Sequence, residues 1–190
     1  MLLGGSLLPA SASAEPGGGL SGAGDGETLL ASRNIAMPFP GVEAAGLHDT
    51  FLDGRPGRRH EAIDIAAARG TKVFAVDDGT LAKLFTSIPG GLTVYQFDPQ
   101  RQLAYYYAHL DRYAAGLREG MPLHRCDLLG YVGTSGNAPP QAPHLHFAVF
   151  RLASPPQWWQ GTPVNPYAAL KSATAAASSG SSAAKTRACR

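Results

Sequence analysis

Short apolar runs separated by turn residues dominate the middle of the chain. The runs are five to eight residues long and are bounded by Gly, Pro or Asp, which is typical of strands rather than helices. Asp78-Gly79 is a hairpin turn pair between two of them. The predicted strands are Lys72–Val76, Thr80–Phe85, Gly91–Phe97, Leu103–Leu110, Leu128–Val132 and Leu145–Val149. This pattern predicts a mainly β fold of antiparallel sheets, packed as a sandwich or open barrel, with a short helical turn at Leu110–Gly116.

Composition divides the chain into four segments. Residues 1–14 join a short apolar patch to Ala12-Ser13-Ala14, a small-x-small cleavage pattern, and so predict a signal peptide. A normal signal starts with Lys or Arg and has a longer apolar run, so a true start upstream of Met1 and a chance match are the alternatives. Residues 15–33 are expected to be a flexible Gly-rich linker, residues 34–170 the folded domain, and residues 171–190 a disordered tail rich in Ala and Ser.

Charge and hydropathy exclude two classes of function. The net charge of +2 is too small for nucleic-acid binding, which needs a concentrated basic face. No stretch of about 18 apolar residues is present, so no transmembrane segment is predicted. The two cysteines are Cys126, inside the domain, and Cys189, next to the C-terminus. Because a structural disulfide to so mobile an end is not expected, both are predicted to be free thiols.

Two histidines share one face of a predicted strand in the segment Pro143–Val149. Side chains alternate along a strand, so its three apolar residues form a core face, and His144 and His146 point together to the opposite face. Adjacent imidazoles suit the binding of a cation between them and a neighbouring group. For so short a motif taken alone, an ordinary polar strand face is an equal alternative.

A second candidate element is the segment His60–Asp64. Its first and last residues share a face, but in a fully extended strand their Cα atoms would be about 13 Å apart, near the limit for sharing one ion. The segment must therefore bend if both bind the same metal. A helical interpretation, one substitution from the His-Glu-x-x-His motif of other zinc peptidases, is rejected because Arg55-Pro56-Gly57 and Arg69-Gly70-Thr71 leave no room for a long helix. Alone, this element is better explained as an exposed salt-bridging pair.

A third candidate, His109, ends the Tyr-rich run. On a regular strand it shares a face with Tyr105 and Tyr107, and Tyr107 is expected to be a packing residue rather than an oxyanion donor. Together, the histidines and the carboxylate suit zinc, which in catalytic sites takes three protein ligands and leaves the fourth position for water. Histidine also takes and gives protons near neutral pH. His48 and His124 are expected to be surface residues.

The chain resembles the lysostaphin-like (LytM-type) peptidoglycan metallopeptidases over roughly residues 37–170. The matching stretches follow the family's order: Arg59-His60, Ile63-Asp64-Ile65, Arg69-Gly70-Thr71-Lys72-Val73, Asp78-Gly79, Tyr107-Ala108-His109-Leu110, Leu129-Gly130, Gly133-Thr134-Ser135-Gly136 and His144-Leu145-His146-Phe147. The resemblance implies an antiparallel β core whose groove holds one Zn²⁺. It implies His60, Asp64 and His146 as the metal ligands, and His109 and His144 as the catalytic residues.

Two positions depart from the family's pattern, and neither removes a ligand. Ala62 stands where the family usually has Gly, in the bend between two ligands, and Ala adopts positive φ only at a cost. Cys126 stands where a turn Gly is common, which affects stability more than chemistry.

The function implied by the resemblance is that of a zinc metalloendopeptidase hydrolysing peptide cross-links of bacterial peptidoglycan. Such a protein is expected to be exported to the periplasm or cell envelope and to act as a monomer. One alternative is a catalytically inactive wall-binding relative that activates an amidase. Another is a metal-dependent enzyme acting on a soluble peptide. Trp158-Trp159 could stack on a glycan, but is expected to seal the domain near Asn165-Pro166.

Overall fold

The computed structural model describes residues 21–178 and 189, so the predicted signal peptide lies outside the described residues. None of the helices within this part of the chain is long and apolar enough to cross a membrane. The helices are α1 (Ser21–Arg33), the 3-10 helix η1 (Ala44–Gly46) and α2 (Tyr167–Ser178). The strands are β1 (Gly54–Arg55), β2 (Arg58–Arg59), β3 (Ile63–Ala66), β4 (Lys72–Phe74), β5 (Gly79–Ser87), β6 (Gly91–Phe97), β7 (Leu103–Tyr113), β8 (Pro122–Leu123), β9 (Leu128–Val132), β10 (His144–Gln157) and β11 (Gln160–Val164).

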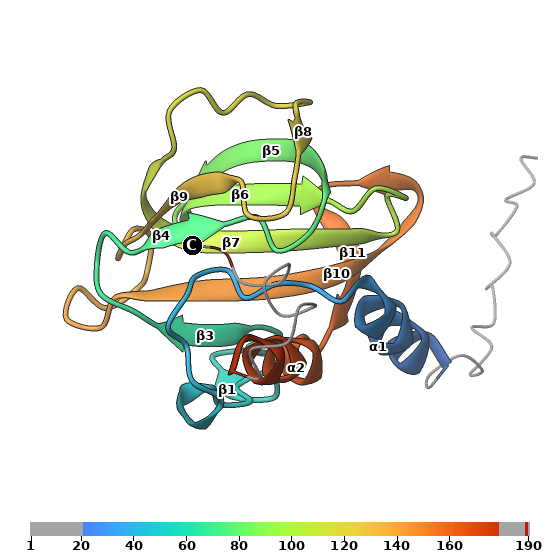
Figure 1. The fold of residues 1–190 in the computed structure, drawn as a ribbon, viewed down its shortest axis with the longest axis horizontal. Coiled ribbons are helices and arrows are strands. Elements are labelled where there is room, and N and C mark those ends of the chain that lie inside the picture. The colour runs from blue at the N-terminus through green and yellow to red at the C-terminus, as the bar shows by residue number, and fades with distance from the viewer. Residues whose placement is uncertain (1–20, 179–188, 190) are drawn as a thin grey trace, which may run out of the picture.

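Nine of these strands form one antiparallel sheet, in which β11, β10, β7, β6, β5 and β8 are neighbours in that order. β3 also pairs with β10, and β9 pairs with both β4 and β7. β1 and β2 form a separate hairpin beside β3 (Figure 1). The expected mainly β, antiparallel fold is therefore confirmed.

The predicted strands are present, but several have different ends. β6 and β9 have the predicted bounds. β7 continues to Tyr113, so the helical turn expected at Leu110–Gly116 is wrong. β10 runs on to Gln157 and returns as β11, a strand that the apolar pattern did not predict.

The core lies on one face of the long strands, as the alternation in β10 predicts. Leu145, Phe147 and Val149 are fully buried. The rings of Tyr107 and Phe147 pack 5.3 Å apart between adjacent strands, and Tyr105 is also fully buried. This packing fixes which face of β10 the intervening histidines occupy.

Helix α1 occupies residues for which a flexible linker was predicted. Its Leu30 is 1% exposed and belongs to the main core. Gly26 faces β11 so closely that a Cβ at this position would lie 2.6 Å from Cγ2 of Val164. Gly26 therefore permits close packing of the helix on the strand. The glycine content of a segment does not show whether its glycines serve this packing or make the chain flexible.

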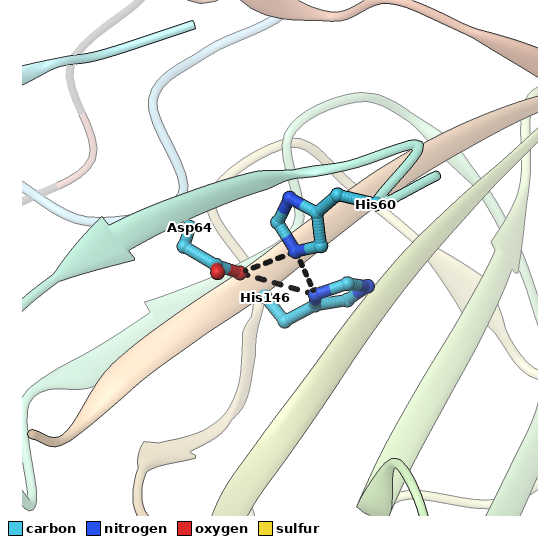
Figure 2. Close-up of side chains that lie close together, drawn as sticks. All are labelled: His60, Asp64 and His146. Carbon is cyan, nitrogen blue, oxygen red and sulfur yellow. Dashed lines mark hydrogen bonds and ion pairs between the residues drawn. The ribbon is translucent and has the colours of Figure 1, made fainter. Parts of the chain in front are cut away.

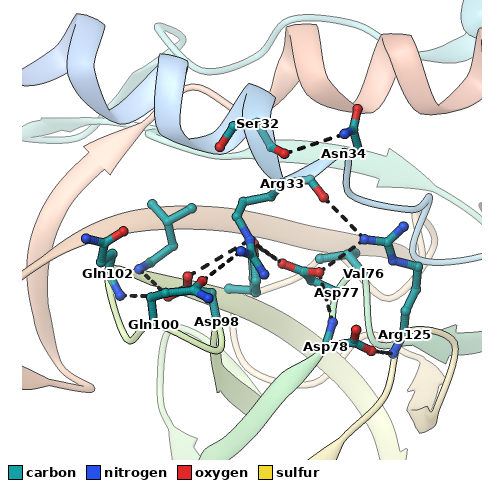
Figure 3. A network of polar contacts seen from close by, with 12 residues as sticks. Ser32, Arg33, Asn34, Val76, Asp77, Asp78, Asp98, Gln100, Gln102 and Arg125 are labelled. Carbon is teal, nitrogen blue, oxygen red and sulfur yellow. Dashed lines mark hydrogen bonds and ion pairs between the residues drawn. The ribbon is translucent and has the colours of Figure 1, made fainter.

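A buried polar network ties the end of α1 to the sheet (Figure 3). Asp77, only 2% exposed, accepts hydrogen bonds from Nε of Arg33 at 2.9 Å and from Nη2 of Arg125 at 3.1 Å. The hydroxyl of Tyr105 donates to the same carboxylate at 2.9 Å. Because a buried carboxylate is stable only when its charge is paired and its oxygens accept hydrogen bonds, these contacts hold α1 in place.

Helix α2 corrects the predicted tail. The tail was expected to be disordered from Lys171 onward, but the helix continues to Ser178. Its first turn is capped by Oδ1 of Asn165, which accepts a hydrogen bond from the backbone N–H of Tyr167 at 3.0 Å. Leu170 is fully buried, so the helix packs on the domain. Alanine, the strongest helix former, supports this conformation once one face has a packing partner.

The two cysteines form a disulfide, so the prediction of free thiols is wrong. Cys126 and Cys189 are 63 residues apart in sequence, with their Cα atoms 5.0 Å apart. Cys189 is 3% exposed and packs with Ala36 and Phe74. Local sequence could not show that the C-terminus returns to this turn. Cys126 has φ +72°, which explains why glycine suits this turn position and why a cysteine there needs a compensating contact.

Candidate metal centre

Three donor atoms converge where β3 lies beside the start of β10 (Figure 2). Nε2 of His60 lies 3.0 Å from Nδ1 of His146, and Oδ1 of Asp64 lies 3.1 Å from each nitrogen. In a tetrahedral zinc site with bonds of 2.0–2.2 Å, two ligand atoms are about 3.3–3.6 Å apart. The three atoms therefore form a triangle slightly smaller than zinc requires, and the group could hold one ion.

Strand pairing places two members of this group side by side. His146 of β10 is the direct cross-strand neighbour of Asp64 in β3. Their flanking residues Leu145 and Ile65, also paired, are buried on the core side. Alternation along both strands therefore turns the imidazole and the carboxylate to the same outer face.

The third member, His60, reaches the group through a bend. His60 precedes β3, and Glu61 has φ +57°, so the chain turns sharply between the two candidate ligands. The bend that one shared ion requires is therefore present. Positive φ falls on Glu61 and not on Ala62, which is fully buried and outside the left-handed region. The replacement of the family's glycine by Ala62 consequently carries no backbone cost of this kind.

Thr50, which the sequence did not indicate as a site residue, stabilises this bend through hydrogen bonds to residues on both sides of it. Nδ1 of His60 donates to the carbonyl oxygen of Thr50 at 3.0 Å, and because a carbonyl only accepts, Nε2 keeps its lone pair for the group. The hydroxyl of Thr50 donates to the carbonyl of Ala62 at 3.1 Å and accepts from the N–H of Asp64 at 3.2 Å. No local pattern marks Thr50, since these contacts span ten to fourteen residues.

Asp64 divides its two carboxylate oxygens between different partners. Oδ1 faces the two imidazoles, while Oδ2 pairs with Nη2 of Arg55 at 3.1 Å. Burial by itself raises the pKa of this carboxyl, but its close contacts with the imidazoles of His146 and His60 outweigh burial and hold the pKa well below its usual value. The carboxylate is therefore ionised at neutral pH, as a metal ligand must be.

Two further histidines, His109 and His144, lie beside the group, and each is held by a hydrogen bond from its Nδ1. Nδ1 of His109 donates to the carbonyl of Ser135 at 2.9 Å, and Nδ1 of His144 donates to the carbonyl of Ala142 at 2.8 Å. These bonds leave the lone pair on Nε2 of each ring. The two rings are 4.9 Å apart, and His109 is 5.6 Å from the ring of His146.

The protonation state of His109 follows from its surroundings. Burial lowers the pKa of His109 to about 4, despite an opposing effect of the hydrogen bond to the carbonyl of Ser135. The imidazole is therefore neutral at pH 7. A neutral ring with Nδ1–H anchored can accept a proton at Nε2.

A bulge in β7 overturns the predicted facing of His109. Tyr105 and Tyr107 are buried in the core, whereas His109 lies with Tyr106 on the side of His146, whose ring is 5.9 Å from that of Tyr106. His109 has φ +60°, and the register between β6 and β7 shifts beside it. An extra residue in one strand reverses the alternation of side chains beyond it. The regular alternation assumed from the sequence therefore placed His109 on the wrong face of the sheet.

Three other residues considered from the sequence, Tyr107, His48 and His124, lie outside the group. Tyr107 is fully buried; its hydroxyl donates to Oε1 of Gln96 at 2.8 Å and accepts from the N–H of Val76 at 3.0 Å, so it is a packing residue as expected. His48 and His124 are exposed, also as expected.

The two tryptophans do not seal the domain where they were expected to. Asn165 bonds to Asp49 through its amide, and the Trp158 ring instead packs 5.0 Å from that of Tyr95 on β6. Trp159 remains 62% exposed. The predicted contact near Asn165-Pro166 is therefore wrong, because the long β10–β11 hairpin carries both rings over the sheet.

Comparisons with known proteins agree with this architecture. The model of peptidase family M23 matches residues 58–166, more than half of the chain and all five of the clustered side chains. An L-Ala–D-Glu endopeptidase of Bacillus subtilis is 30% identical over 131 residues, which cover 65% of this chain and 40% of that protein.

Two solved structures show the same fold. A Ruminococcus gnavus protein, provisionally named glycyl-glycine endopeptidase LytM, is 30% identical with a TM-score of 0.56, over 67% of this chain and 53% of its own. Helicobacter pylori Csd3 is 24% identical with a TM-score of 0.53, over 73% of this chain and 35% of its own. The chain thus spans about a third to a half of the length of these relatives. By the extent of the family match, this chain belongs to peptidase family M23.

Proposed function

We propose that the protein is a zinc-dependent endopeptidase that hydrolyses peptide cross-links of bacterial peptidoglycan. The observation that carries the proposal is the convergence of five side chains. Three have donor atoms 3.0–3.1 Å apart. The other two are imidazoles whose Nδ1 is bonded to a backbone carbonyl, and Nε2 of one of them, His144, lies 3.7 Å from Oδ1 of Asp64. Membership of the M23 family supports the same reaction class.

In this proposal His60, Asp64 and His146 hold the metal. Two neutral imidazoles and one carboxylate form a common ligand set of catalytic zinc, which leaves a position open for water. A zinc ion held there would act as a Lewis acid and would lower the pKa of water toward about 7. The hydrogen bond from His60 to Thr50 and the ion pair of Asp64 with Arg55 fix the orientation of these ligands.

His109 and His144 carry the proton transfers. Peptide hydrolysis adds water to the carbonyl carbon, breaks the C–N bond and delivers a proton to the departing amine. The Nε2 atom of a neutral His109 can accept the proton from water, and an imidazole at this position can return it to the amine. His144, 4.9 Å away, can donate a hydrogen bond to the developing oxyanion once its Nε2 is protonated.

The substrate class is inferred from the relatives and the compartment. One relative is named for an L-Ala–D-Glu bond and another for a glycyl-glycine bond, so the family site accepts peptide bonds of different composition. The Cys126–Cys189 disulfide suits an oxidising compartment, which supports a location in the periplasm or cell envelope. We therefore propose an exported protein that acts on peptidoglycan peptides as a monomer.

Digestion of purified peptidoglycan tests the function. The protein is incubated with peptidoglycan sacculi and with defined muropeptides, with and without a chelator, and the products are identified by mass spectrometry. The expected result is release of fragments cut at one peptide bond, abolished by the chelator and restored by added Zn²⁺. Release of sugar fragments only, or cleavage of soluble peptides without any action on sacculi, would contradict the proposal.

Matched variants separate the roles of the histidines. His60→Ala and His146→Ala are expected to lose both zinc and activity, whereas His109→Ala is expected to lose activity and keep zinc. Zinc content is measured by elemental analysis of the purified proteins. Full turnover in either ligand variant would show that the assigned ligands are wrong.

The alternative of an inactive amidase activator makes a different prediction. Such a protein would stimulate a purified amidase while leaving sacculi uncut by itself, and His109→Ala would stimulate as well as the wild type. The presence of all five side chains in one group favours the peptidase.

A further inference from the structure

A continuous row of aromatic rings crosses the outer face of the sheet from the metal centre. The ring of Tyr106 lies 5.9 Å from that of His146 and 4.6 Å from that of Tyr95, which lies 5.0 Å from Trp158. Strand pairing supports this path, because Tyr95 and Tyr106 are direct cross-strand neighbours on β6 and β7. The row therefore joins the candidate metal centre to the tip of the β10–β11 hairpin.

At that tip the row ends in a small cleft. The residues that line it are Tyr95, Phe150, Trp158, Trp159, Gln160 and Gly161. Trp159 is 62% exposed, and its ring lies 5.4 Å from that of Trp158 in an edge-to-face arrangement. Nearby Phe85 is 39% exposed and its ring lies 5.2 Å from Trp158. Large aromatic side chains gathered and left exposed in this way indicate a binding surface.

The chemistry of the cleft favours a neutral, amphipathic ring. None of the side chains that line the cleft is charged. Lys83 lies nearby, with Nζ 5.9 Å from the centre of the Trp158 ring, but its ammonium pairs with the carboxylate of Glu119 at 3.0 Å. The cleft combines the faces of aromatic rings with the amide of Gln160 and the open backbone of Gly161. A pyranose ring has an apolar C–H face and hydroxyl groups at its edge, which match these two kinds of surface.

We propose that this cleft, which we call the tip cleft, binds a sugar ring of the peptidoglycan glycan strand. The inference rests on the proposed function, since it places the glycan and the peptide of one substrate along the same face of the sheet. An extended peptide advances at most about 3.3–3.6 Å per residue. The three ring-to-ring steps, 5.9, 4.6 and 5.0 Å, therefore separate the two ends of the row by no more than the reach of about four or five extended residues. A peptide attached to the sugar can thus extend along the row to the metal centre.

Binding of a sugar alone tests the tip cleft without reference to catalysis. A tetramer of N-acetylglucosamine is titrated into the whole protein while tryptophan fluorescence is recorded. The wild type is expected to show a saturable change, Trp159→Ala to lose it, and Trp159→Phe, which keeps an aromatic face, to retain much of it. Because Trp159 is largely exposed, both variants are expected to fold, which their thermal unfolding checks. No saturable change in the wild type, or equal binding by Trp159→Ala, would overturn the proposal.

A cleavage assay then links the tip cleft to the substrate. The same cross-linked peptide is offered with its disaccharide and without it. Trp159→Ala is expected to lower kcat/KM about tenfold on the sugar-bearing substrate, the scale of one aromatic stacking contact, and to leave the sugar-free peptide unchanged. An equal effect on both substrates would assign Trp159 a merely structural role and overturn the inference. If the wild type cleaves neither substrate, the proposed function fails, and the sugar titration alone decides the tip cleft.

Discussion

Removing the hydroxyl of Thr50 perturbs the candidate metal centre without touching any ligand. Thr50→Val keeps the shape of the side chain and the backbone carbonyl that accepts from Nδ1 of His60. It removes the oxygen that binds the N–H of Asp64 at 3.2 Å and the carbonyl of Ala62 at 3.1 Å. The variant therefore frees the bend between two ligands while leaving the tautomer of His60 intact.

The expected size of the effect follows from these contacts. Ala62 is fully buried, so its carbonyl loses a partner that water does not easily replace. Leaving a buried polar group unsatisfied costs about 1–3 kcal/mol of the free energy of unfolding. Loss of a contact that orients a metal ligand typically weakens metal binding about 10–100-fold, and we expect a change of this size.

Both quantities are measured on the same preparations. Zinc affinity is determined by competition with a chromophoric chelator, and the free energy of unfolding of the metal-free protein by urea denaturation. Thr50→Ser is the matched control because it keeps the hydroxyl, and its zinc affinity is expected to stay within about threefold of the wild type. If Thr50→Val binds zinc as tightly as the wild type, the bend holds its shape without this hydroxyl and the reasoning is refuted.

Two further variants test contacts that the structure adds to the sequence. Arg55→Gln removes the partner of Oδ2 of Asp64 and is expected to weaken zinc binding about tenfold. Less than about 1 kcal/mol of stability is expected to be lost, because the arginine side chain is 40% exposed and exposed ion pairs contribute little. Tighter zinc binding, measured by chelator competition, would show that the arginine instead competes with the metal. Cys189→Ser removes the disulfide to Cys126 and is expected to lower the free energy of unfolding by up to about 4 kcal/mol, from loop closure over 63 residues, while zinc affinity is unchanged. Urea denaturation measures this loss, and a reductant is expected to cause the same loss in the wild type. Equal stability of the variant and the wild type would contradict the prediction.

Local sequence was sufficient to predict the features that depend only on residues close together in the chain. Alternation in Pro143–Val149 predicted both the buried face of β10 and the shared orientation of His144 and His146, since a strand packed on a core must send alternate side chains outward. The required bend between His60 and Asp64 could also be deduced, because a fully extended chain places their Cα atoms near the limit for sharing one ion. The family pattern then named the five residues that the structure brings together.

Errors arose where one residue departs from regular geometry or where a distant segment packs on another. A single bulge at His109 places its side chain on the opposite face from the one that regular strand alternation predicts, and the neighbouring sequence gives no sign of the bulge. The Gly-rich residues before Asn34 form a helix because Leu30 finds a buried site on the sheet and Gly26 permits the close approach. Composition records flexibility of the free chain, whereas packing decides whether that flexibility is kept.

By itself, the sequence determined the antiparallel β class, the outward face of β10 and the set of side chains suited to zinc. Tertiary structure alone decided that Thr50 and Arg55 orient two of those side chains, that Cys126 and Cys189 meet, and that Trp159 ends an aromatic row. The physical reason is the range of the interactions. Alternation and turn preferences act between near neighbours, whereas ligand support, disulfide pairing and ring packing join positions that come together only when the sheet has formed.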